Sequence, residues 1–417
     1  MMSIDLTTAL TLPSGARLPN RIAKVALSEG LSDRTQAPTY KLIRLYRRWA
    51  DSGAGLLITG NVMIDRRALS ELGNVAVEDD RHIELLAEWA AAATAGGGQA
   101  WVQLCHPGRQ APRALNGGSV APSEITAGST LGVYGKPRAL TTAEIDDVIH
   151  RFATAARTVV AAGFTGVQIH AAHGYLLSQF LSPLTNLRTD AWGGTPVKRR
   201  RLLLEIVRAV RAELGPHTPV SVKLNSADFQ RGGMDEDEST EVVLALALEG
   251  IDLLEISGGT FESVAFMGAP DGAIRASTRA REAYFLDYAE RVRTTITHAG
   301  ADLPLMVTGG FRSTSVMTEA ITSGAIDVVG LGRPLIMEPD LPQRLLAGGS
   351  GARPIRPRKL GIKQFEGMGE LLWYGVQLRR LGNGKNPDPN RHPVRNLPLY
   401  LIRAGMLGRP QRRGFAI

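Results

Sequence analysis

Residues 166–194 read GVQIHAAHGYLLSQFLSPLTNLRTDAWGG, and they change character from an apolar run to a polar, glycine-containing one. The first part, residues 166–171, has the apolar composition and the length of a buried strand, whereas the last part has the composition of a loop. His170, His173 and Tyr175 fall within six positions at the point where the strand should stop. Enzymes built on parallel α/β folds carry their functional groups at the carboxyl ends of the strands. The stretch therefore predicts both a buried strand and a candidate site.

The chain on both sides of this stretch alternates between two patterns. From residue 20 to about residue 347, short apolar or β-branched runs are followed by amphipathic stretches, as in a parallel α/β sheet. Eight runs have strand character, and they lie at residues 22–27, 55–64, 99–105, 166–171, 219–225, 252–258, 304–310 and 326–332. The intervening helical stretches include residues 39–53, 143–163 and 199–215, each of which ends at a glycine suited to a left-handed C-cap.

Eight strand-then-helix units predict an α/β fold of the (β/α)8 barrel type, also called a TIM barrel, over residues 1–349. A doubly wound open sheet is the competing architecture. It is less favoured because no G-x-G-x-x-G dinucleotide fingerprint follows any of the eight strands. Two connections, residues 106–141 and the region around residues 261–279, are longer than a minimal barrel needs, and both leave strand carboxyl ends, where barrel enzymes build active sites.

Residues 350–417 form a predicted C-terminal extension with a different character. Residues 351–417 hold 14 Lys/Arg against 3 Asp/Glu, so the formal net charge of +8 comes from this tail. The pattern predicts a helix followed by an irregular basic segment, packed on the barrel wall or at a subunit contact. Docking on a membrane is a weaker reading, and because no nucleic-acid-binding signature accompanies the charge, nucleic acid is not an expected partner.

Composition also restricts the class of protein. A chain of 417 residues with 44% hydrophobic residues can bury a large core. No apolar run has transmembrane length, and the first lysine or arginine is Arg17, so we expect neither a secretory signal nor a membrane span, and a cytoplasmic location. The single cysteine, Cys105, excludes an intramolecular disulfide and a four-thiolate metal site, and we expect it to be an inert core residue.

Polar and glycine residues gather at the predicted strand ends, which in a barrel converge on one mouth. They are Ser28, Gly60, Asn61, Gln103, His170, His173, Lys223, Gly309, Gly310, Gly332 and Arg333. Glycine pairs after the last two strands allow backbone N–H groups to approach an anion, and Arg333 adds a guanidinium, so these strand ends predict a phosphate site. Because there is no Walker sequence, this phosphate is expected to belong to a bound cofactor.

Three of these residues suit a flat heterocycle. Lys223 lies in a buried strand, where its ammonium group requires an anion or an electron-rich ring unless it escapes to solvent. Gln103 can donate and accept hydrogen bonds at once, which matches a ring edge with alternating N–H and C=O groups. Together with the small polar Ser28, they describe the lining of a ring site.

The histidine pair has three interpretations. His170 and His173 could be core residues whose ring nitrogens are hydrogen-bonded within the protein. They could also be metal ligands, or neutral hydrogen-bond donors that bind a carbonyl oxygen or an anion. A metal site normally includes a carboxylate, and Glu255 is the only one among the neighbouring strand ends, so the metal interpretation comes second. Tyr175, two residues beyond His173, would then act as a general acid toward the same ligand.

Four motifs resemble the old yellow enzyme family of FMN-dependent ene reductases, which are (β/α)8 barrels. They are LPNRIAKVALS, WVQLCHPGR, the block at residues 163–194, and VTGGFRS with DVVGLGRPLI. The block at residues 163–194 is the most specific, because H-x-x-H-G-Y-L is followed by F-L-S-P-x-x-N-x-R-x-D-x-W-G-G. The resemblance covers residues 4–347.

The resemblance implies a set of site residues. Non-covalently bound FMN would be held by Val25, Ala26, Leu27, Ser28, Gly60, Gln103, Lys223, Gly309, Gly310, Gly332 and Arg333. Lys223 would lie near N1 and O2 of the flavin, where a cation stabilises the reduced ring. His170 and His173 would polarise the electron-withdrawing group of the substrate, and Tyr175 would deliver a proton.

The chain departs from the family pattern at Lys198, where relatives usually have Asn, at Gly30, which replaces a residue that is often aromatic, and in its longer tail. Some relatives carry an iron-sulfur cluster and a second nucleotide domain, which one cysteine and the lack of a Rossmann fingerprint argue against here.

The resemblance therefore implies an NAD(P)H:flavin oxidoreductase in which hydride passes from NAD(P)H through flavin N5 to the β-carbon of an electron-poor alkene. A homo-oligomer is an assembly state that stays open. Two alternatives stay open at this point. One is a metal-dependent barrel lyase or hydrolase that uses His170 and His173, and the other is a flavin-binding protein whose basic tail docks on an anionic surface.

Overall fold

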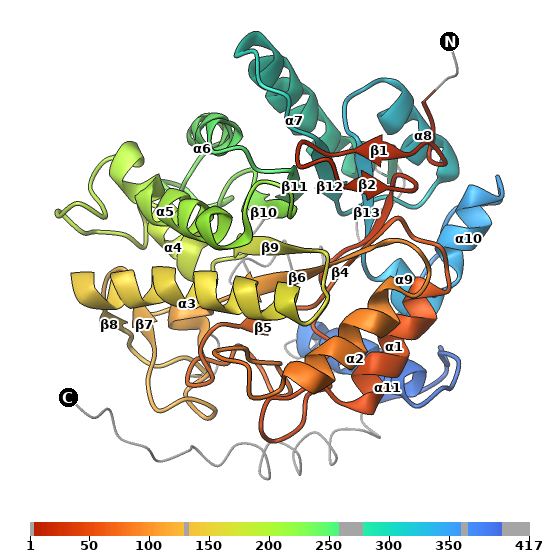
Figure 1. Ribbon diagram of the computed structural model, residues 1–417, viewed down its shortest axis with the longest axis horizontal. Coiled ribbons are helices and arrows are strands. Elements are labelled where there is room, and N and C mark those ends of the chain that lie inside the picture. Colours follow the sequence, from red (N-terminus) through yellow and green to blue (C-terminus); the bar gives the residue numbers. More distant parts are fainter. Residues whose placement is uncertain (1–3, 129–132, 258–277, 360–365, 394–417) are drawn as a thin grey trace.

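The computed structural model describes residues 4–128, 133–257, 278–359 and 366–393. Within these residues, eight parallel strands close into the predicted barrel, surrounded by helices (Figure 1). In ring order the strands are β3 (Ile22–Lys24), β4 (Leu56–Ile58), β6 (Gln99–Cys105), β9 (Gly166–Ala171), β10 (Val220–Asn225), β11 (Leu253–Ser257), β12 (Leu305–Thr308) and β13 (Val328–Leu331). The ring closes because β13 pairs with β3, with Val329 opposite Ile22. All eight predicted strands are thus confirmed.

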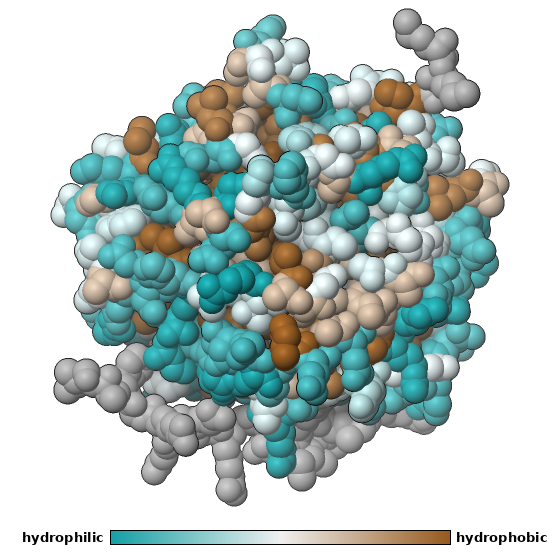
Figure 2. All heavy atoms as spheres, viewed as in Figure 1, coloured by the Kyte–Doolittle hydropathy of each residue, from teal (hydrophilic) through white to brown (hydrophobic). Residues whose placement is uncertain are grey.

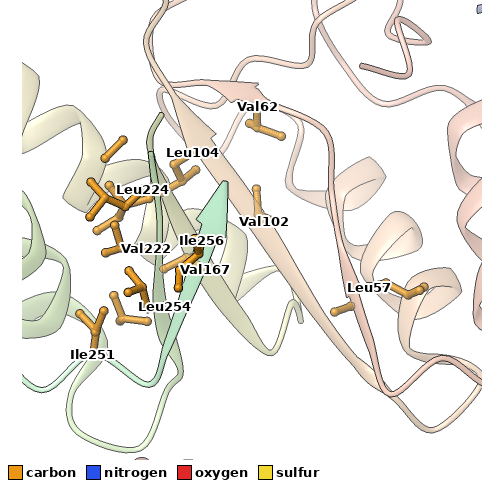
Figure 3. Packing of buried hydrophobic residues seen from close by; sticks show 14 of the residues in the cluster. Leu57, Val62, Val102, Leu104, Val167, Val222, Leu224, Ile251, Leu254 and Ile256 are labelled. Atoms are coloured by element: carbon orange, nitrogen blue, oxygen red, sulfur yellow. The ribbon is translucent and has the colours of Figure 1, made fainter. Parts of the chain in front are cut away.

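The strands are buried on both faces, as expected of a parallel sheet that is covered by helices. Side chains alternate between the two faces of each strand. Outward side chains such as Val102, Val167, Val222 and Ile256 belong to one large core that continues into the helices (Figure 3). A separate apolar cluster fills the inside of the barrel near the strand starts, and it includes Ala23, Val25, Leu56, Ile58, Trp101, Leu253, Met306 and Val328.

A short N-terminal hairpin covers the amino end of the barrel. It consists of β1 (Leu10–Thr11) and β2 (Arg17–Leu18), paired antiparallel. Leu12 and Leu18 pack into the apolar cluster inside the barrel, and the backbone N–H of Ser14 donates to Oδ1 of Asp252 at 2.7 Å. With this end covered, ligands reach the barrel from the carboxyl ends of the strands.

The principal wall helices follow the strands in the predicted order. In chain order they are α1 (Tyr40–Ala50), α2 (Ile83–Thr94), α3 (Thr142–Ala161), α5 (Pro196–Leu214), α6 (Glu236–Leu248), α7 (Thr278–His298) and α8 (Thr314–Thr322). Local chemistry explains where they begin: Thr39 caps α1, and Thr141 with Glu144 forms a capping box at α3. The glycine after α5, Gly215, has a φ of 71°, the left-handed conformation predicted for this helix end.

Shorter elements lie in the connections. After β4 comes β5 (Val62–Met63), and the long connection after β6 contains the 3-10 helix η1 (Gly108–Gln110), β7 (Val120–Ala121) and β8 (Arg138–Ala139). After β9 comes α4 (Leu176–Leu181), and after β13 come α9 (Pro334–Met337) and α10 (Leu341–Leu346). The second predicted long connection, around residues 261–279, lies almost entirely outside the described residues.

The described part of the C-terminal extension contains α11 (Glu366–Gly382), which packs against α1 and α9. Trp373 of α11 is completely buried. Gly382 lies so close to α1 that a Cβ atom there would come within 2.8 Å of the carbonyl oxygen of Lys41. This contact agrees with the prediction that the extension packs on the barrel wall, whereas the domain boundary near residue 349 stays a prediction and residues 394–417 lie outside the description.

The surface of the described residues offers no membrane-crossing element: none of their helices combines the length and the apolarity that a bilayer span requires. The face in Figure 2 is largely hydrophilic, with hydrophobic residues scattered among the polar ones.

Candidate active site

The three aromatic side chains of the opening motif meet at the carboxyl end of β9. The rings of His170 and His173 lie 5.1 Å apart, and those of His170 and Tyr175 lie 5.0 Å apart, both in edge-to-face arrangements. All three residues are at most 8% exposed. His173 has a φ of 63°, a left-handed conformation that is uncommon outside glycine, so the chain turns sharply between the strand and α4. The predicted grouping of these rings is therefore present.

Both imidazoles are neutral near pH 7. Burial, and then the nearby charge of Lys223, holds the pKa of His170 and of His173 well below the usual 6.5. Nδ1 of His170 accepts a hydrogen bond from the backbone N–H of Ala172 at 3.2 Å, which leaves the proton on Nε2. Nε2 of His173 lies 2.9 Å from Oγ of Ser257. Each ring thus has at least one nitrogen engaged by the protein.

Tyr175 keeps its proton over the ordinary pH range. Burial raises the pKa of the phenol well above 10, Cys105, Glu71 and Tyr134 raise it further, and a hydrogen bond with Ser70 lowers it in part. Cys105 itself is a buried free thiol whose pKa is raised by burial, as expected of an inert core residue. A protonated phenol next to two neutral imidazoles is suited to deliver a proton to a bound molecule.

A layer of polar side chains lies inside the barrel above its apolar cluster. Lys223 on β10 donates from Nζ to Oε1 of Glu255 on β11 at 2.8 Å, and its side chain is 4% exposed. The lysine is therefore buried and paired with an anion, and the alternative that its ammonium reaches solvent is wrong. Gln103 on β6 donates from Nε2 to Oε1 of Gln168 on β9 at 2.7 Å, so it belongs to the same layer.

The predicted phosphate residues lie at the ends of the adjacent strands β12 and β13. Gly309 and Gly310 have φ values of 114° and 87°, which side-chain-bearing residues rarely adopt. A Cβ atom at Gly332 would meet Val25 and Leu27 at an ordinary 3.4 Å, so these three residues are neighbours.

Arg333 follows Gly332, and its side chain is 61% exposed and donates to Oε1 of Glu370 on α11 at 2.9 Å. Sequence reasoning did not foresee this partner, because the two residues are far apart in the chain.

The end of the first strand is held by a buried ion pair that sequence reasoning also missed. Lys24 is completely buried on the outer face of β3, beneath α1. Its Nζ donates to Oε1 of Glu29 at 2.8 Å, to the hydroxyl of Tyr46 at 2.8 Å and to the carbonyl oxygen of Ile58 at 2.9 Å. A lysine inside a strand and a glutamate just past it were the available signal.

Gly60 is required by this arrangement. A Cβ atom at this position would lie 2.0 Å from Oε2 of Glu29 and 2.0 Å from the carbonyl oxygen of Leu27. Of the predicted residues of the first strand, Val25 is buried, Ala26 and Leu27 are half-buried, and Ser28 is exposed. The close approach of Gly60 to Leu27 brings the ends of β3 and β4 together at the mouth.

Glu71 is a further titratable group at the mouth, and no local pattern pointed to it. Its loop interlocks with the loop after β3, because a Cβ atom at Gly73 would lie 2.5 Å from the carbonyl oxygen of Gly30. Burial and the charge of Glu29 raise the pKa of Glu71 to about 7, although a hydrogen bond with Ser28 opposes the shift. Its Oε1 atom is buried and has no hydrogen-bond partner within the described part of the chain.

The donor set fits a flat heterocycle that carries a phosphate. The interior layer contains the cation of Lys223 and the amide of Gln103, the strand ends supply glycines in left-handed conformations, and neutral imidazoles lie at the side. The described residues contain no cluster of three or more His, Cys, Asp or Glu side chains arranged to hold a metal ion. Flavin mononucleotide is a cofactor of this kind, with a flat ring and a phosphate.

Comparison with known proteins shows the family to which the chain belongs. Residues 8–350 match the profile of the NADH:flavin oxidoreductase / NADH oxidase family. An NADH-dependent flavin oxidoreductase of Hypocrea jecorina is 38% identical over 369 residues, which are 83% of this chain and 90% of that protein. Another such protein, of Neonectria, is 37% identical over 363 residues, which are 81% of this chain, and the chain spans only 47% of that protein's length.

Solved structures show the same relationship. An old yellow enzyme homologue from Zymomonas mobilis is 27% identical with a TM-score of 0.70, covering 84% of this chain and 94% of the other. Morphinone reductase in complex with tetrahydroNAD is 27% identical with a TM-score of 0.69, covering 85% of this chain and 93% of the other. A 2-naphthoyl-CoA reductase shares the fold, at 24% identity, a TM-score of 0.78, and coverage of 91% of this chain and 57% of the other. The resemblance to old yellow enzymes is confirmed, and the chain belongs to the NADH:flavin oxidoreductase / NADH oxidase family.

Proposed function

We propose that this protein is an FMN-dependent oxidoreductase that uses NAD(P)H to reduce a small electron-poor substrate, with an activated alkene of the enone type as the leading candidate. The observation that carries the proposal is the grouping of two neutral imidazoles and a protonated phenol beside the interior layer that contains Lys223. Membership of the family supports the choice of cofactor and reductant. When bound, FMN supplies the hydride chemistry between the nicotinamide and the substrate.

We assign the ring-binding role to Lys223, Gln103, Gly60 and the end of the first strand, which consists of Val25, Ala26, Leu27 and Ser28. Lys223 places a positive charge in a buried position, where it stabilises negative charge that develops on a bound ring. We assign the phosphate-binding role to Gly309, Gly310, Gly332 and Arg333. Since Arg333 is paired with Glu370, a phosphate would share this guanidinium with the carboxylate or replace it.

His170 and His173 bind the carbonyl oxygen of the substrate in this proposal. A neutral imidazole N–H donates to an oxygen without introducing a full charge into the buried site. Polarising the carbonyl group makes the β-carbon of the conjugated alkene a better hydride acceptor. The lowered pKa of both residues keeps the required protonation state throughout the neutral range.

Tyr175 protonates the α-carbon as hydride arrives at the β-carbon. The C=C double bond becomes a single bond, two C–H bonds form, and the phenolate regains its proton from solvent. In anaerobic stopped-flow measurements, we expect Tyr175→Phe to slow the alkene half-reaction by about 100-fold or more, the range for loss of a general acid, and to leave flavin reduction by NADH nearly unchanged. Equal slowing of both half-reactions would refute the proton-donor role.

Tyr288→Phe is a matched control for that experiment. Tyr288 is a buried tyrosine on α7 whose hydroxyl donates to Oγ of Ser239 at 2.8 Å. This substitution also removes a buried phenol hydroxyl, so it reports any general loss of stability. We expect it to leave both half-reactions unchanged.

The extension at residues 350–417 has a supporting role in this proposal. α11 packs on α1 and α9 and supplies Glu370 to Arg333, so it braces the strand end that is assigned to the phosphate. Replacing Glu370 with Gln tests this role, because a change in the dissociation constant of FMN without a change in fold would connect the extension to the cofactor.

A further inference from the structure

The interior layer is organised around one carboxylate. Glu255 is completely buried on β11 and accepts hydrogen bonds from side chains of three other strands. Its Oε1 accepts from Nζ of Lys223 at 2.8 Å and from Oγ1 of Thr308 at 2.6 Å, and its Oε2 accepts from Nε2 of Gln168 at 2.8 Å. A carboxylate buried this deeply is tolerated only with such compensation.

The carboxylate fixes the orientation of two amide groups in series. An ionised carboxylate only accepts hydrogen bonds, so Gln168 must turn its NH2 group toward Glu255. The Oε1 atom of Gln168 then faces Gln103 and accepts from its Nε2 at 2.7 Å. The same NH2 group of Gln168 also donates to Oγ of Ser221 at 3.3 Å, although a hydroxyl could satisfy either orientation of the amide. If either amide were flipped, two oxygens would face each other.

The consequence for Gln103 is a defined polarity. Its NH2 group is directed at Gln168, so its Oε1 atom is turned away from Gln168, and one N–H remains beside that oxygen. Without the carboxylate on β11, neither amide would have a hydrogen-bonding preference for this orientation. The same carboxylate offsets the charge of Lys223, the second interior group that we assign to the ring.

We propose that Glu255 is a positioning residue for the flavin site. It binds the Lys223 ammonium directly and, through Gln168, sets the positions of the oxygen and the NH2 group of the Gln103 amide relative to the ring. This inference rests on the proposed function, because it assumes that Gln103 and Lys223 contact the flavin. It adds two residues, Glu255 and Gln168, that touch neither the substrate nor the cofactor. It also requires that they act through hydrogen-bond direction and charge rather than through packing alone.

Glu255 thus acts in two ways: an electrostatic arm, its ion pair with Lys223, and an orienting arm, its hydrogen bond through Gln168 to Gln103. Three single variants separate these two arms. Gln168→Met breaks the relay to Gln103 and keeps the pair of Lys223 and Glu255, whereas Glu255→Gln removes the charge from both arms. Thr308→Val is the matched control, because it removes one donor to Glu255 but touches neither arm. We expect the first two variants to raise the dissociation constant of FMN by about tenfold, the consequence of one misdirected buried hydrogen bond, and the control to stay near wild type.

The reduction potential of bound FMN distinguishes the arms. Removing the negative charge in Glu255→Gln leaves the charge of Lys223 unbalanced, so the potential should shift to more positive values, whereas Gln168→Met should leave it near wild type. An unchanged potential in Glu255→Gln would overturn the electrostatic arm. Wild-type FMN affinity in a folded Gln168→Met variant would overturn the orienting arm, even if Glu255→Gln failed to fold.

A polarity swap provides a rescue. In the double variant Gln168→Glu with Glu255→Gln, the new carboxylate again accepts from Nε2 of Gln103, so the dissociation constant of FMN should return toward the wild-type value. A role in packing alone predicts no such recovery. These outcomes are separate from the fate of the proposed function: a wild-type protein that binds no FMN would refute the proposed function, whereas FMN binding that is unaffected by the variants would refute only the role of Glu255.

Discussion

Removing the charge of Glu29 should destabilise the protein more than the loss of any surface ion pair. Glu29→Gln leaves Lys24 completely buried with only neutral partners, the hydroxyl of Tyr46, the carbonyl oxygen of Ile58 and the face of the Trp49 ring at 4.4 Å. Breaking a buried pair by removing one partner typically costs about 3–5 kcal/mol. Because these neutral partners continue to solvate the ammonium, we expect a value near the lower end, about 3 kcal/mol.

The pH dependence of this loss provides a second signature. Burial lowers the pKa of Lys24 from its usual 10.5, and the charge of Glu29 opposes that shift. In the variant, the pKa of folded Lys24 falls further below that of the unfolded chain. Between these two pKa values the unfolded chain binds a proton that the folded chain does not, so stability rises with pH. The variant should therefore recover part of its lost stability as the pH approaches 10.5.

Equilibrium urea unfolding of the variant and the wild type, at about pH 7 and again at about pH 9.5, measures both quantities. Arg47→Gln is the control on the same helix, because it removes an exposed pair with Asp51 and should cost less than about 1 kcal/mol. The double variant Lys24→Met with Glu29→Gln removes both charges and should be more stable than Glu29→Gln alone. A single variant as stable as wild type, or a double variant less stable than the single one, would refute this reasoning.

Three further predictions follow from the same geometry. Gly60→Ala should destabilise the fold by about 3 kcal/mol in thermal unfolding, because the new methyl group would collide with the carbonyl oxygen of Leu27. Stability should fall as the pH drops below about 6.5, since His170 and His173 have lowered pKa values and only the unfolded chain takes up their protons; substitution of both by Asn should flatten this dependence. Glu71 has a pKa raised from the usual 4.5 to about 7, so its contribution to stability is full below 4.5 and is lost as the pH rises from 4.5 to about 7; Glu71→Gln should gain stability relative to wild type over that interval, as measured by urea unfolding.

The barrel and much of its mouth were predictable because both depend on local pattern and on chain order. Buried parallel strands have a continuous apolar composition, and their carboxyl ends must converge once the ring closes. His170, His173 and Tyr175 could be grouped from one stretch of sequence because a single short turn brings them together. Lys223 could be recognised as exceptional because a cation in a buried strand demands a partner.

The partners themselves were not predictable, because they depend on which face of a strand each side chain occupies and on contacts between distant loops. From the sequence, Glu255 was considered only as a metal ligand. The register between β10 and β11 places it opposite Lys223 on the neighbouring strand. Alternation along β3 does imply that Lys24 faces the helices when Ala23 and Val25 face inward, but the return of Glu29 toward it depends on the loop. Glu71 approaches the site only because Gly30 and Gly73 let two loops interlock.

The two buried ion pairs lie on opposite sides of the barrel wall, and their positions indicate different roles, one in the stability of the wall and one in the proposed ring site. Replacing a buried pair with apolar residues of similar size is often neutral or stabilising, so stability alone does not explain why a barrel retains one. The pair of Lys24 and Glu29 lies between β3 and α1, where it closes the wall and fixes the loop that begins with Ser28. The pair of Lys223 and Glu255 lies inside the barrel and belongs to a layer whose side chains donate, directly or in series, to Glu255. In the proposed function, Lys223 and Gln103 of this layer meet the flavin ring, so the second pair would serve the cofactor whereas the first serves the barrel wall.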